Sequence, residues 1–436
     1  FLSHYEAHFY DFHPYLTVRE SRRIIGDYEL NLIDAVEKTH FDDLVAVASS
    51  DYDPHFVGYG EYSRCGFLLP HSNIVKVEIP FRSLLPKGLE GVMVVGKAFS
   101  QTHNVLQFTR MSADLTVLGY LAGQIAAKSA VGNDHLRNFQ IKELQKEWFS
   151  RGFIPGEFSD LTTGNRLNDP EEIDFRIKSL GEGKDEFLYE CCRLSKESCV
   201  TELKNNFHSS PDGRGKLLLA KALAWFGESE GCRLIMNELA EMFDEERSKG
   251  YPGGFVETYD DIRGREKNML KGLFWRINQN MALLAMAGYR EATSVIRHIL
   301  DNTVAGGGMV KRESDYYDER IDLKIIPFYN RILNLCFFAE RVPDSALIPG
   351  LEKLLDDENV GGYMTDNYHE TRWKVFGAVL ETAIASALAR CGSKRGYSLL
   401  VDYLDDIHFN LSNFAANELK ELTGRSYSTD REQWED

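Results

Sequence analysis

The sequence predicts a multidomain chain in which an α+β domain is followed by an all-α domain. The chain has 436 residues, which exceeds one ordinary domain, and 43% of them are hydrophobic, enough for more than one packed core. Short β-like runs are confined to the first third of the chain. After residue 165 they give way to amphipathic helical stretches, which indicates a change of architecture.

The first domain is expected to combine strands and helices. Strand-like runs rich in Val, Ile, Leu or Tyr cover Arg23 to Leu32, Leu44 to Ala48, Val75 to Ile79 and Gly91 to Val95. The last run is continuously apolar and is followed by Gly96, which is typical of a strand buried on both faces of a sheet.

Two helices are expected after these strands. The first, Met111 to Ala130, has an apolar stripe, and its small residues Gly119, Gly123 and Ala127 would let it approach a sheet or a ligand closely. The second runs from Gln140 to Arg151 and is closed by Gly152. The polar stretch from Asn165 to Glu172 then predicts a domain boundary.

The rest of the chain is expected to be helical. Numerous helices with short connections favour stacked helical pairs, a solenoid, over a single irregular bundle, although the internal repeat is degenerate. The predicted helices include Glu171 to Leu180, Lys216 to Phe226, Arg233 to Phe243, Met269 to Met286, Ala292 to Leu300, Leu323 to Phe338, Leu347 to Leu355, Thr371 to Arg390, Gly396 to Leu404 and Asn413 to Leu422.

Composition excludes several function classes. The formal net charge of −17, without a basic stripe, argues against nucleic acid or an anionic membrane as the main partner. No apolar run is long enough to span a membrane. The seven Cys residues have neither zinc spacing nor a disulfide pattern, and are expected to be buried thiols. The His residues of the aromatic opening, His4, His8 and His13, read as core or interface residues rather than as metal ligands, so no metal is expected.

Four motifs resemble, in order, the C-terminal half of the FAD-dependent oxidoreductase family. They are VRESRRIIGDYEL (18–30), IPFRSLLPKGLEGVMVVGKAFSQTH (79–103), TRMSADLTVLGYLAGQIAA (109–127) and ELQKEWFSRGFIPG (143–156). The final stretch, ELTGRSYSTDREQWED (421–436), is similar to the end of HEAT-like repeat proteins. The resemblance implies the C-terminal part of an FAD-dependent oxidoreductase domain over 1–156 and a HEAT-like α-helical repeat domain over 165–436.

The sequence departs from the family pattern in three ways. It has no strand, GxGxxG turn and helix to hold the FAD pyrophosphate. Lys97 stands where the family usually has Arg, and YLAG (120–123) replaces QAAG. Because the sequence opens at Phe1 without Met, we expect the oxidoreductase domain to be incomplete, with the dinucleotide-binding unit and any signal peptide upstream. The compartment is left open.

The resemblance also implies a set of site residues. Thr109 or Arg110 is expected to open the helix to Ala127, whose positive end would face the flavin. The residues expected to contact FAD are Gly96, Lys97, Ser100, Thr102, Thr109, Arg110, Gly119 and Gly123. Those expected on the side of a polar or anionic small-molecule substrate are Arg22, Arg23, Tyr28, Arg82 and His103.

Each assignment has a structural alternative. Arg22 and Arg23 could pair with Glu20, Asp27 or Glu29, and His103 could be a helix-entry residue. Gly119 and Gly123 could serve packing alone. Two functions stay open: a flavoenzyme that takes a hydride from a small organic substrate, with a helical tail for stability or for a protein partner, and a non-catalytic helical scaffold with an oxidoreductase remnant.

Overall fold

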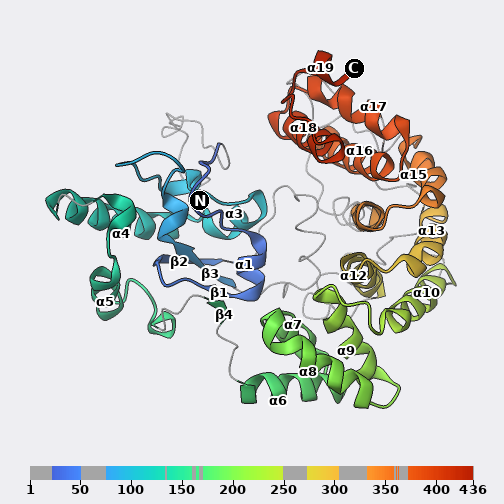
Figure 1. Cartoon of the computed structure of the whole chain (residues 1–436), viewed down its shortest axis with the longest axis horizontal. Coiled ribbons are helices and arrows are strands. Elements are labelled where there is room, and N and C mark those ends of the chain that lie inside the picture. The colour runs from blue at the N-terminus through green and yellow to red at the C-terminus, as the bar shows by residue number, and fades with distance from the viewer. Residues whose placement is uncertain are drawn as a thin grey trace, which may run out of the picture. The chain divides into compact units, whose positions relative to one another are not determined.

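The computed structural model describes residues 22–50, 75–132, 135–159, 164–165, 170–248, 273–303, 331–357, 360, 362 and 372–435. They fall into two compact units. The first contains the described residues of 22–31, 40–50 and 75–159, and the second contains 32–39 and those from 164 onward. Figure 1 traces both units, coloured along the chain.

The first unit is built on an antiparallel pair of strands, β2 (Leu44–Ser50) and β3 (Val75–Pro80). Their register runs from Ala46 opposite Ile79 to Ser50 opposite Val75. The predicted strands Leu44 to Ala48 and Val75 to Ile79 are therefore confirmed. Alternating β-branched and aliphatic side chains suit this arrangement, because they pack on the pleated surface.

Helices pack on this hairpin. A 3-10 turn, η2 (Phe81–Leu84), follows β3 directly, and a second one, η3 (Gly96–Ala98), precedes α3 (His103–Thr109). Helix α4 (Ser112–Gly132) contacts β2 and η3, and α3 contacts both strands. The unit continues through η4 (Leu136–Asn138), α5 (Lys142–Ser150) and η5 (Gly156–Phe158). Gly152, with φ +73°, follows α5, as the sequence predicts.

Two predicted strands of this unit are wrong. Within the described chain, Arg23 to Leu32 forms only isolated bridges, Gly26 with Pro86 and Leu30 with Gln101, and a helix begins at Leu32. Gly91 to Val95 is not a buried strand: Val92 and Val95 are 45% and 38% exposed, and no described strand lies beside the segment. The small residues of α4 do not bring it close to the sheet, and their predicted approach to a ligand stays a prediction. A Cβ atom added at Gly119 or Gly123 would meet no atom within 4 Å, because the helix packs through another stripe. That stripe consists of Leu118, Leu121, Ala122, Ile125 and Ser129.

The second unit is mostly helical. It begins with α1 (Leu32–Glu37). Two short strands, β1 (Thr39–His40) and β4 (Gly164–Asn165), pair with one another. The helices that follow are α6 (Pro170–Gly181), α7 (Glu186–Cys192), α8 (Lys196–Ser209), α9 (Arg214–Trp225), α10 (Cys232–Ser248), α12 (Leu273–Met286), α13 (Thr293–Asp301), a helix over 331–341, α15 (Ile348–Leu355), α16 (Arg372–Arg390), α17 (Lys394–Asp402), α18 (Phe409–Thr423) and α19 (Arg431–Glu435). Short 3-10 turns η7 (Arg290–Ala292), η8 (Ser345–Leu347) and η9 (Tyr403–Asp405) connect some of them.

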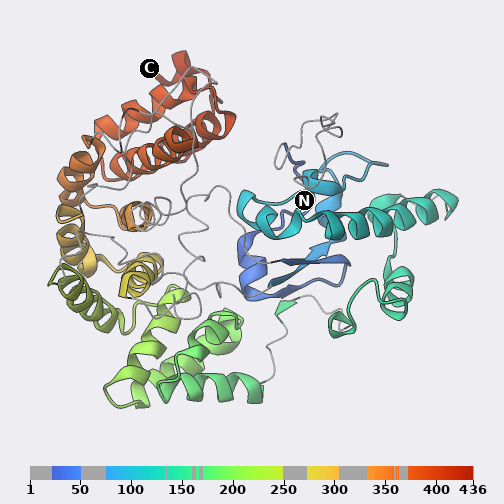
Figure 2. The ribbon, with the colours of Figure 1, turned by 180° about the vertical axis from the view of Figure 1, so that it is seen from behind.

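Most helices from α6 onward contact helices that are close to them in sequence. Helix α10 packs on α9, α12 and α13, α13 packs on α15, and α16 packs on α15, α17 and α18. The helices consequently follow one another in a row, which Figures 1 and 2 show from opposite sides. The described parts of the predicted helices are confirmed, and the structure adds α19.

Buried polar groups join the helices of the row. Lys221 Nζ and Glu238 form an ion pair at 2.5 Å, with side chains 4% and 12% exposed. Asn280 Nδ2 donates to the same carboxylate at 2.9 Å. Farther along, Arg331 donates to Glu246 at 2.8 Å. Because unpaired charges are costly to bury, these contacts fix which helices meet.

Six of the seven Cys residues are described, and all six are buried and free, as the sequence predicts. Cys65 and the His residues of the opening lie outside the described residues. Among the described helices, none combines the length and apolar character that a bilayer span requires.

Candidate functional site

The candidate site lies where three segments far apart in sequence meet in the first unit. Tyr28 N–H donates to the Arg82 carbonyl at 3.3 Å, and Ser100 N–H donates to the Ser83 carbonyl at 2.9 Å. Leu30 N–H donates in turn to the Ser100 carbonyl at 3.2 Å. The backbone thus brings together the segment around Tyr28, the turn η2 and the segment that leads into α3. All three carry residues predicted for the site.

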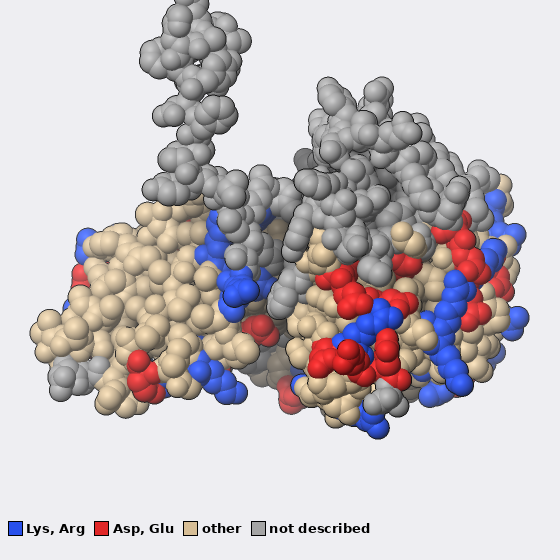
Figure 3. All heavy atoms as spheres, turned by 90° about the horizontal axis from the view of Figure 1, so that it is seen from above, with Lys and Arg blue, Asp and Glu red and all other residues tan. Residues whose placement is uncertain are grey.

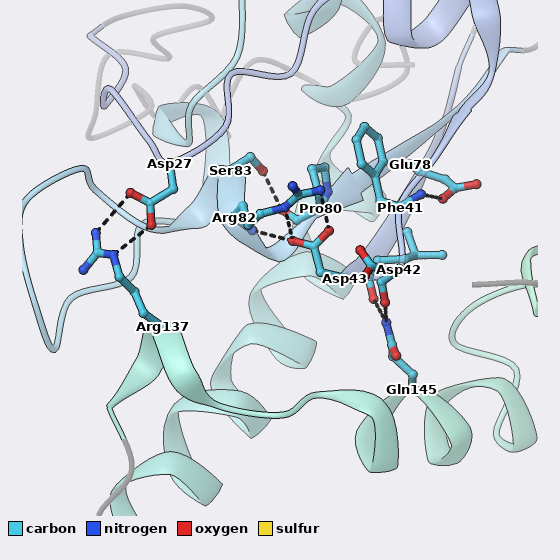
Figure 4. Close-up of polar contacts among 11 residues, drawn as sticks. Asp27, Phe41, Asp42, Asp43, Glu78, Pro80, Arg82, Ser83, Arg137 and Gln145 are labelled. Atoms are coloured by element: carbon cyan, nitrogen blue, oxygen red, sulfur yellow. Dashed lines mark hydrogen bonds and ion pairs between the residues drawn. The ribbon is translucent and has the colours of Figure 1, made fainter. Parts of the chain in front are cut away.

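Arg82 is held by an acidic partner. Its Nε and Nη2 atoms donate to the two carboxylate oxygens of Asp43 at 2.9 and 3.1 Å, and its backbone N–H donates to the same carboxylate at 2.9 Å (Figure 4). The guanidinium also lies 5.4 Å from the centre of the Tyr28 ring. Burial lowers the pKa of Arg82, and the hydrogen bonds and negative charge of Asp43 raise it by more. The net effect is a raised pKa.

Other predicted substrate-side residues are less enclosed. Arg22 is exposed and Arg23 is half-buried. Asp27, one of their expected partners, pairs with Arg137, whose Nε donates to it at 2.8 Å. Arg137 Nη1 also contacts Glu90 at 2.8 Å (Figure 4 shows the Asp27 pair). His103 is the first residue of α3 and is half-buried, which is the position its structural alternative expects.

The segment from Ser100 to Arg110 is unusually polar for its burial. Ser100, Gln101, Gln107 and Thr109 are all less than 3% exposed. Thr109 Oγ1 donates to Gln101 Oε1, and Gln107 Nε2 donates to the His103 carbonyl at 3.1 Å. Ser100 Oγ has no hydrogen-bond partner in the described structure. A buried hydroxyl without a partner costs free energy, so this one is a candidate contact for a bound group.

The glycines predicted for the cofactor site are open to approach. Gly96 has φ +76°, a conformation that favours glycine, and no atom lies within 4 Å of a Cβ added there. The same is true of the space around Gly119 and Gly123. Lys97 and Thr102, which follow Gly96 in sequence, are half-buried. The space beside the Gly96 Cα atom is therefore open.

The helix start that the sequence predicts is wrong. Thr109 is the last residue of α3 and Arg110 is its C-cap, whereas α4 opens at Ser112. The first turn of α4 holds Asp114, whose carboxylate accepts the Ser49 N–H at 3.2 Å. Burial raises the pKa of Asp114 and the Ser49 hydrogen bond lowers it, with a net rise. A carboxylate already occupies the positive end of this helix.

Several polar residues of the site were missed by sequence reasoning. Asp43 and Arg137 hold the neighbouring loops, and Gln145 Nε2 donates to the carbonyls of Asp42 and Leu44 at 2.9 and 3.0 Å (Figure 4). The His40 side chain pairs with buried Glu78, which also accepts the Phe41 N–H at 3.1 Å. The pair Asp42-Asp43 just before a strand was the one available signal. Within the described residues, no group of three or more His, Cys, Asp or Glu is arranged to hold a metal ion.

Comparison with known proteins gives one match. No curated protein and no solved structure matches this chain. Residues 2–148 match the model of a family described as FAD dependent oxidoreductase, which confirms the resemblance found in the motifs at the level of the family. The match covers about a third of the chain, lies in its N-terminal region and includes every residue named in the candidate site. That region is similar to a family whose members depend on FAD.

Proposed function

We propose that the first unit is the C-terminal part of an FAD-dependent oxidoreductase domain, spanning 1–156, and that it takes part in hydride transfer from a small organic substrate to flavin. The family match over residues 2–148 carries this proposal. It is supported by the buried polar side chains from Ser100 to Thr109. Burying polar side chains costs free energy, so their presence indicates a role beyond packing.

The residues present fit one side of a flavin. Ser100 Oγ is a buried polar atom without a partner, and the Gly96 backbone is open to approach. Around these two, Lys97, Thr102, Thr109 and Arg110 would supply polar contacts, and Gly119 and Gly123 would leave room along α4. When bound, FAD supplies the hydride acceptor, and the chain supplies binding, orientation and electrostatics.

The substrate would be oriented by the cationic side chains beside this segment. Arg82 is positioned by Asp43, so its guanidinium has a fixed direction, which favours an oriented contact with a polar or anionic group. Tyr28 lies against the same guanidinium. Arg22, Arg23 and His103 would complete the substrate side.

Ser100→Ala tests the cofactor contact. Because the hydroxyl has no partner within the protein, its removal should leave the free energy of unfolding unchanged or slightly higher. If Ser100 bonds to the cofactor, the Kd for FAD should rise about tenfold, measured by quenching of flavin fluorescence. Ser150→Ala, which removes an exposed hydroxyl on α5, is the control. An unchanged Kd in Ser100→Ala would remove this residue from the cofactor site.

We further propose that 165–436 forms a HEAT-like α-helical repeat domain. The contacts between helices close in sequence support a solenoid, since its repeats touch their neighbours. The last segment supports it too. Trp434 is buried, its Nε1 donates to the Ser428 carbonyl at 3.0 Å, and Arg431 pairs with Asp402 at 2.8 Å. Such a terminal helix would cover the end of the row and leave its long surface for a protein partner.

A second function is a non-catalytic scaffold in which the oxidoreductase-like region no longer holds FAD. The sequence favours it in one respect, because no strand–GxGxxG–helix element occurs in residues 1–436. The surface of the helical unit is charged, with acidic and basic side chains interspersed (Figure 3). Failure of the purified protein to take up FAD, together with binding of a protein by the helical unit alone, would favour the scaffold.

A further inference from the structure

Three helices of the second unit meet at the hydroxyl of Ser386. This residue lies on α16 and is fully buried, and its Oγ atom is 2.7 Å from Oε1 of Glu340 and 2.6 Å from Oε2 of Glu418. Glu340 belongs to the helix over 331–341, and Glu418 belongs to α18. One hydroxyl therefore lies within hydrogen-bond distance of two carboxyl groups on two other helices of the row.

These two contacts require two hydrogen atoms. A serine hydroxyl donates a single hydrogen, and an ionised carboxylate can only accept. If Glu340 and Glu418 were both ionised, one of the short oxygen–oxygen contacts would contain no hydrogen and would be repulsive. Both contacts become hydrogen bonds when one carboxyl group keeps its proton and donates it to Ser386 Oγ, which donates to the other carboxylate. Two carboxyl groups held this close can share one proton in this way.

Arg390 decides which of the two carboxyl groups is ionised. Its Nη2 atom donates to Oε2 of Glu418 at 2.9 Å, the same atom that Ser386 contacts. A guanidinium in direct contact favours the charged form of a carboxyl group. Glu418 is therefore the carboxylate that accepts from Ser386, and the proton lies on Glu340.

The other titratable groups around this contact have their own environments. Cys336 and Cys391 lie near Glu340, and burial raises the pKa of both thiols, so they stay neutral. Charged groups on α15, α17 and α18 lie in other contacts: Glu352 accepts the Ser393 hydroxyl at 3.3 Å, Arg395 pairs with Asp356 at 2.5 Å, and Glu421 lies 4.0 Å from Arg390. The contact among Glu340, Ser386 and Glu418 thus titrates as a group of its own.

We propose that Glu340, Ser386 and Glu418 form a pH-sensitive joint between three helices, closed by one proton on Glu340. With the proton bound, both glutamates are tied to α16 through Ser386. When the proton leaves to solvent at higher pH, the Glu340 carboxylate faces the Ser386 oxygen and a second carboxylate, and the helix over 331–341 loses this attachment to α16. The joint therefore stabilises the row at acidic pH and opens as pH rises, the reverse of an ordinary ion-paired carboxylate. It does not depend on flavin.

Infrared spectroscopy of the full chain tests for the proton directly, because a protonated carboxyl group has a C=O band that a carboxylate lacks. We expect this band near neutral pH in the unchanged protein, its loss in Glu340→Gln, and its retention in Glu421→Gln. Glu421 is the matched control, since its carboxylate is 68% exposed beside the same arginine. Equal spectra of Glu340→Gln and Glu421→Gln would overturn the proposal.

Hydrogen–deuterium exchange measures the opening of the joint. An amide at position 340 donates to Ser386 at every pH, so Glu340→Gln serves as the closed reference, and comparison at one pH cancels the intrinsic exchange rate. Peptides from the helix over 331–341 should exchange equally in both proteins near pH 5 and about tenfold faster in the unchanged protein near pH 9. A ratio that stays at one across the series would show that the proton controls no opening.

Thermal denaturation near pH 7 distinguishes the two carboxyl groups. Glu418→Gln should lower Tm by about 4 °C, because it leaves Arg390 without its charged partner. Glu340→Gln should change Tm by less than about 2 °C, since an amide replaces a group that is already neutral. Equal losses in the two variants would mean that both carboxyl groups are ionised, and a loss in Glu340→Gln alone would place the proton on Glu418. Either result contradicts the assignment.

Discussion

Arg82 and Asp43 form a two-pronged ion pair, with N–O distances of 2.9 and 3.1 Å, between the turn after β3 and the residue just before β2. Asp43 also accepts the backbone N–H of Arg82, and its own carbonyl accepts the Phe81 N–H at 2.7 Å. One acidic residue therefore fixes both the side chain and the backbone of the turn. The orientation of Arg82 in the candidate site depends on it.

Asp43→Ala should destabilise the first unit by about 2 kcal/mol, because it removes three hydrogen bonds and leaves a half-buried guanidinium without its partner. Urea denaturation followed by circular dichroism measures the change. Glu143→Ala is the control, since Glu143 and Lys146 form an exposed pair with side chains 80% and 73% exposed. Equal stability of the two variants would contradict the role of Asp43.

Replacement of glycine by alanine should have opposite effects on stability at Gly215 and at Gly123. At Gly215 an added Cβ would lie 1.8 Å from the Gly181 carbonyl oxygen, so Gly215→Ala should destabilise the second unit by about 3 kcal/mol as α6 and α9 separate. At Gly123 the space is open and the residue is inside α4, so Gly123→Ala should stabilise the first unit by about 0.5–1 kcal/mol.

Thermal denaturation of both variants measures these changes, and FAD titration of Gly123→Ala adds a second readout. A stabilised protein with a raised Kd for FAD would place Gly123 beside the cofactor. A stabilised protein with an unchanged Kd would leave Gly123 as an exposed helix position. Destabilisation by Gly123→Ala would contradict the open face of α4.

The ion pair of Lys221 and Glu238 should make the free energy of unfolding depend on pH in the acidic range. Burial raises the pKa of Glu238, but the charge and hydrogen bond of Lys221, with Asn280 and Arg276, lower it further, and the net pKa lies below the ordinary 4.5. A carboxyl group of this kind stabilises the fold above its unfolded pKa. The stabilisation is lost as pH falls through the lower folded pKa.

Glu238→Gln should accordingly cost about 3 kcal/mol near pH 7, because it leaves Lys221 buried without a charged partner. The difference from the unchanged protein should shrink below pH 4.5 as Glu238 becomes protonated. Urea denaturation at a series of pH values gives the profile. A difference that is constant from neutral to acid pH would show that the charge of Glu238 does not stabilise the row.

The buried thiols should be unreactive in the folded protein. Burial raises the pKa of Cys191, Cys199 and Cys232 to about 12, compared with the ordinary 9.0, and a thiol reacts through its thiolate. Mass spectrometry after brief iodoacetamide treatment at pH 8 should find these residues unmodified in the native protein and modified in urea. Because their folded pKa is the higher one, their contribution to stability is lost as pH rises from 9 toward 12.

Local pattern predicted several elements correctly. Strand β2 follows from its run of Val and Ala and helix α16 from helical periodicity, and both lie where the sequence indicates. Gly91 to Val95 was wrongly predicted as a buried strand. A continuous apolar run can belong to a strand buried on both faces of a sheet or to an exposed segment, as it does here.

The candidate site could be predicted only in part, because the residues that orient its side chains are distant in sequence. The family motifs identified the segments, but the partners that orient their side chains come from elsewhere in the chain. Asp43 lies 39 residues from Arg82, and Arg137 lies 110 residues from Asp27. No local pattern encodes such pairs, because they arise when distant segments pack together.

The visible absorption spectrum of the purified protein tests the flavin assignment most directly. The protein is expressed from its complete natural reading frame, mixed with excess FAD and separated by gel filtration, with a denaturation step to distinguish bound from covalent flavin. We expect the bands of oxidised flavin to elute with the protein and to bleach under a suitable small organic substrate. A colourless protein that does not retain FAD would contradict the oxidoreductase function and favour the scaffold.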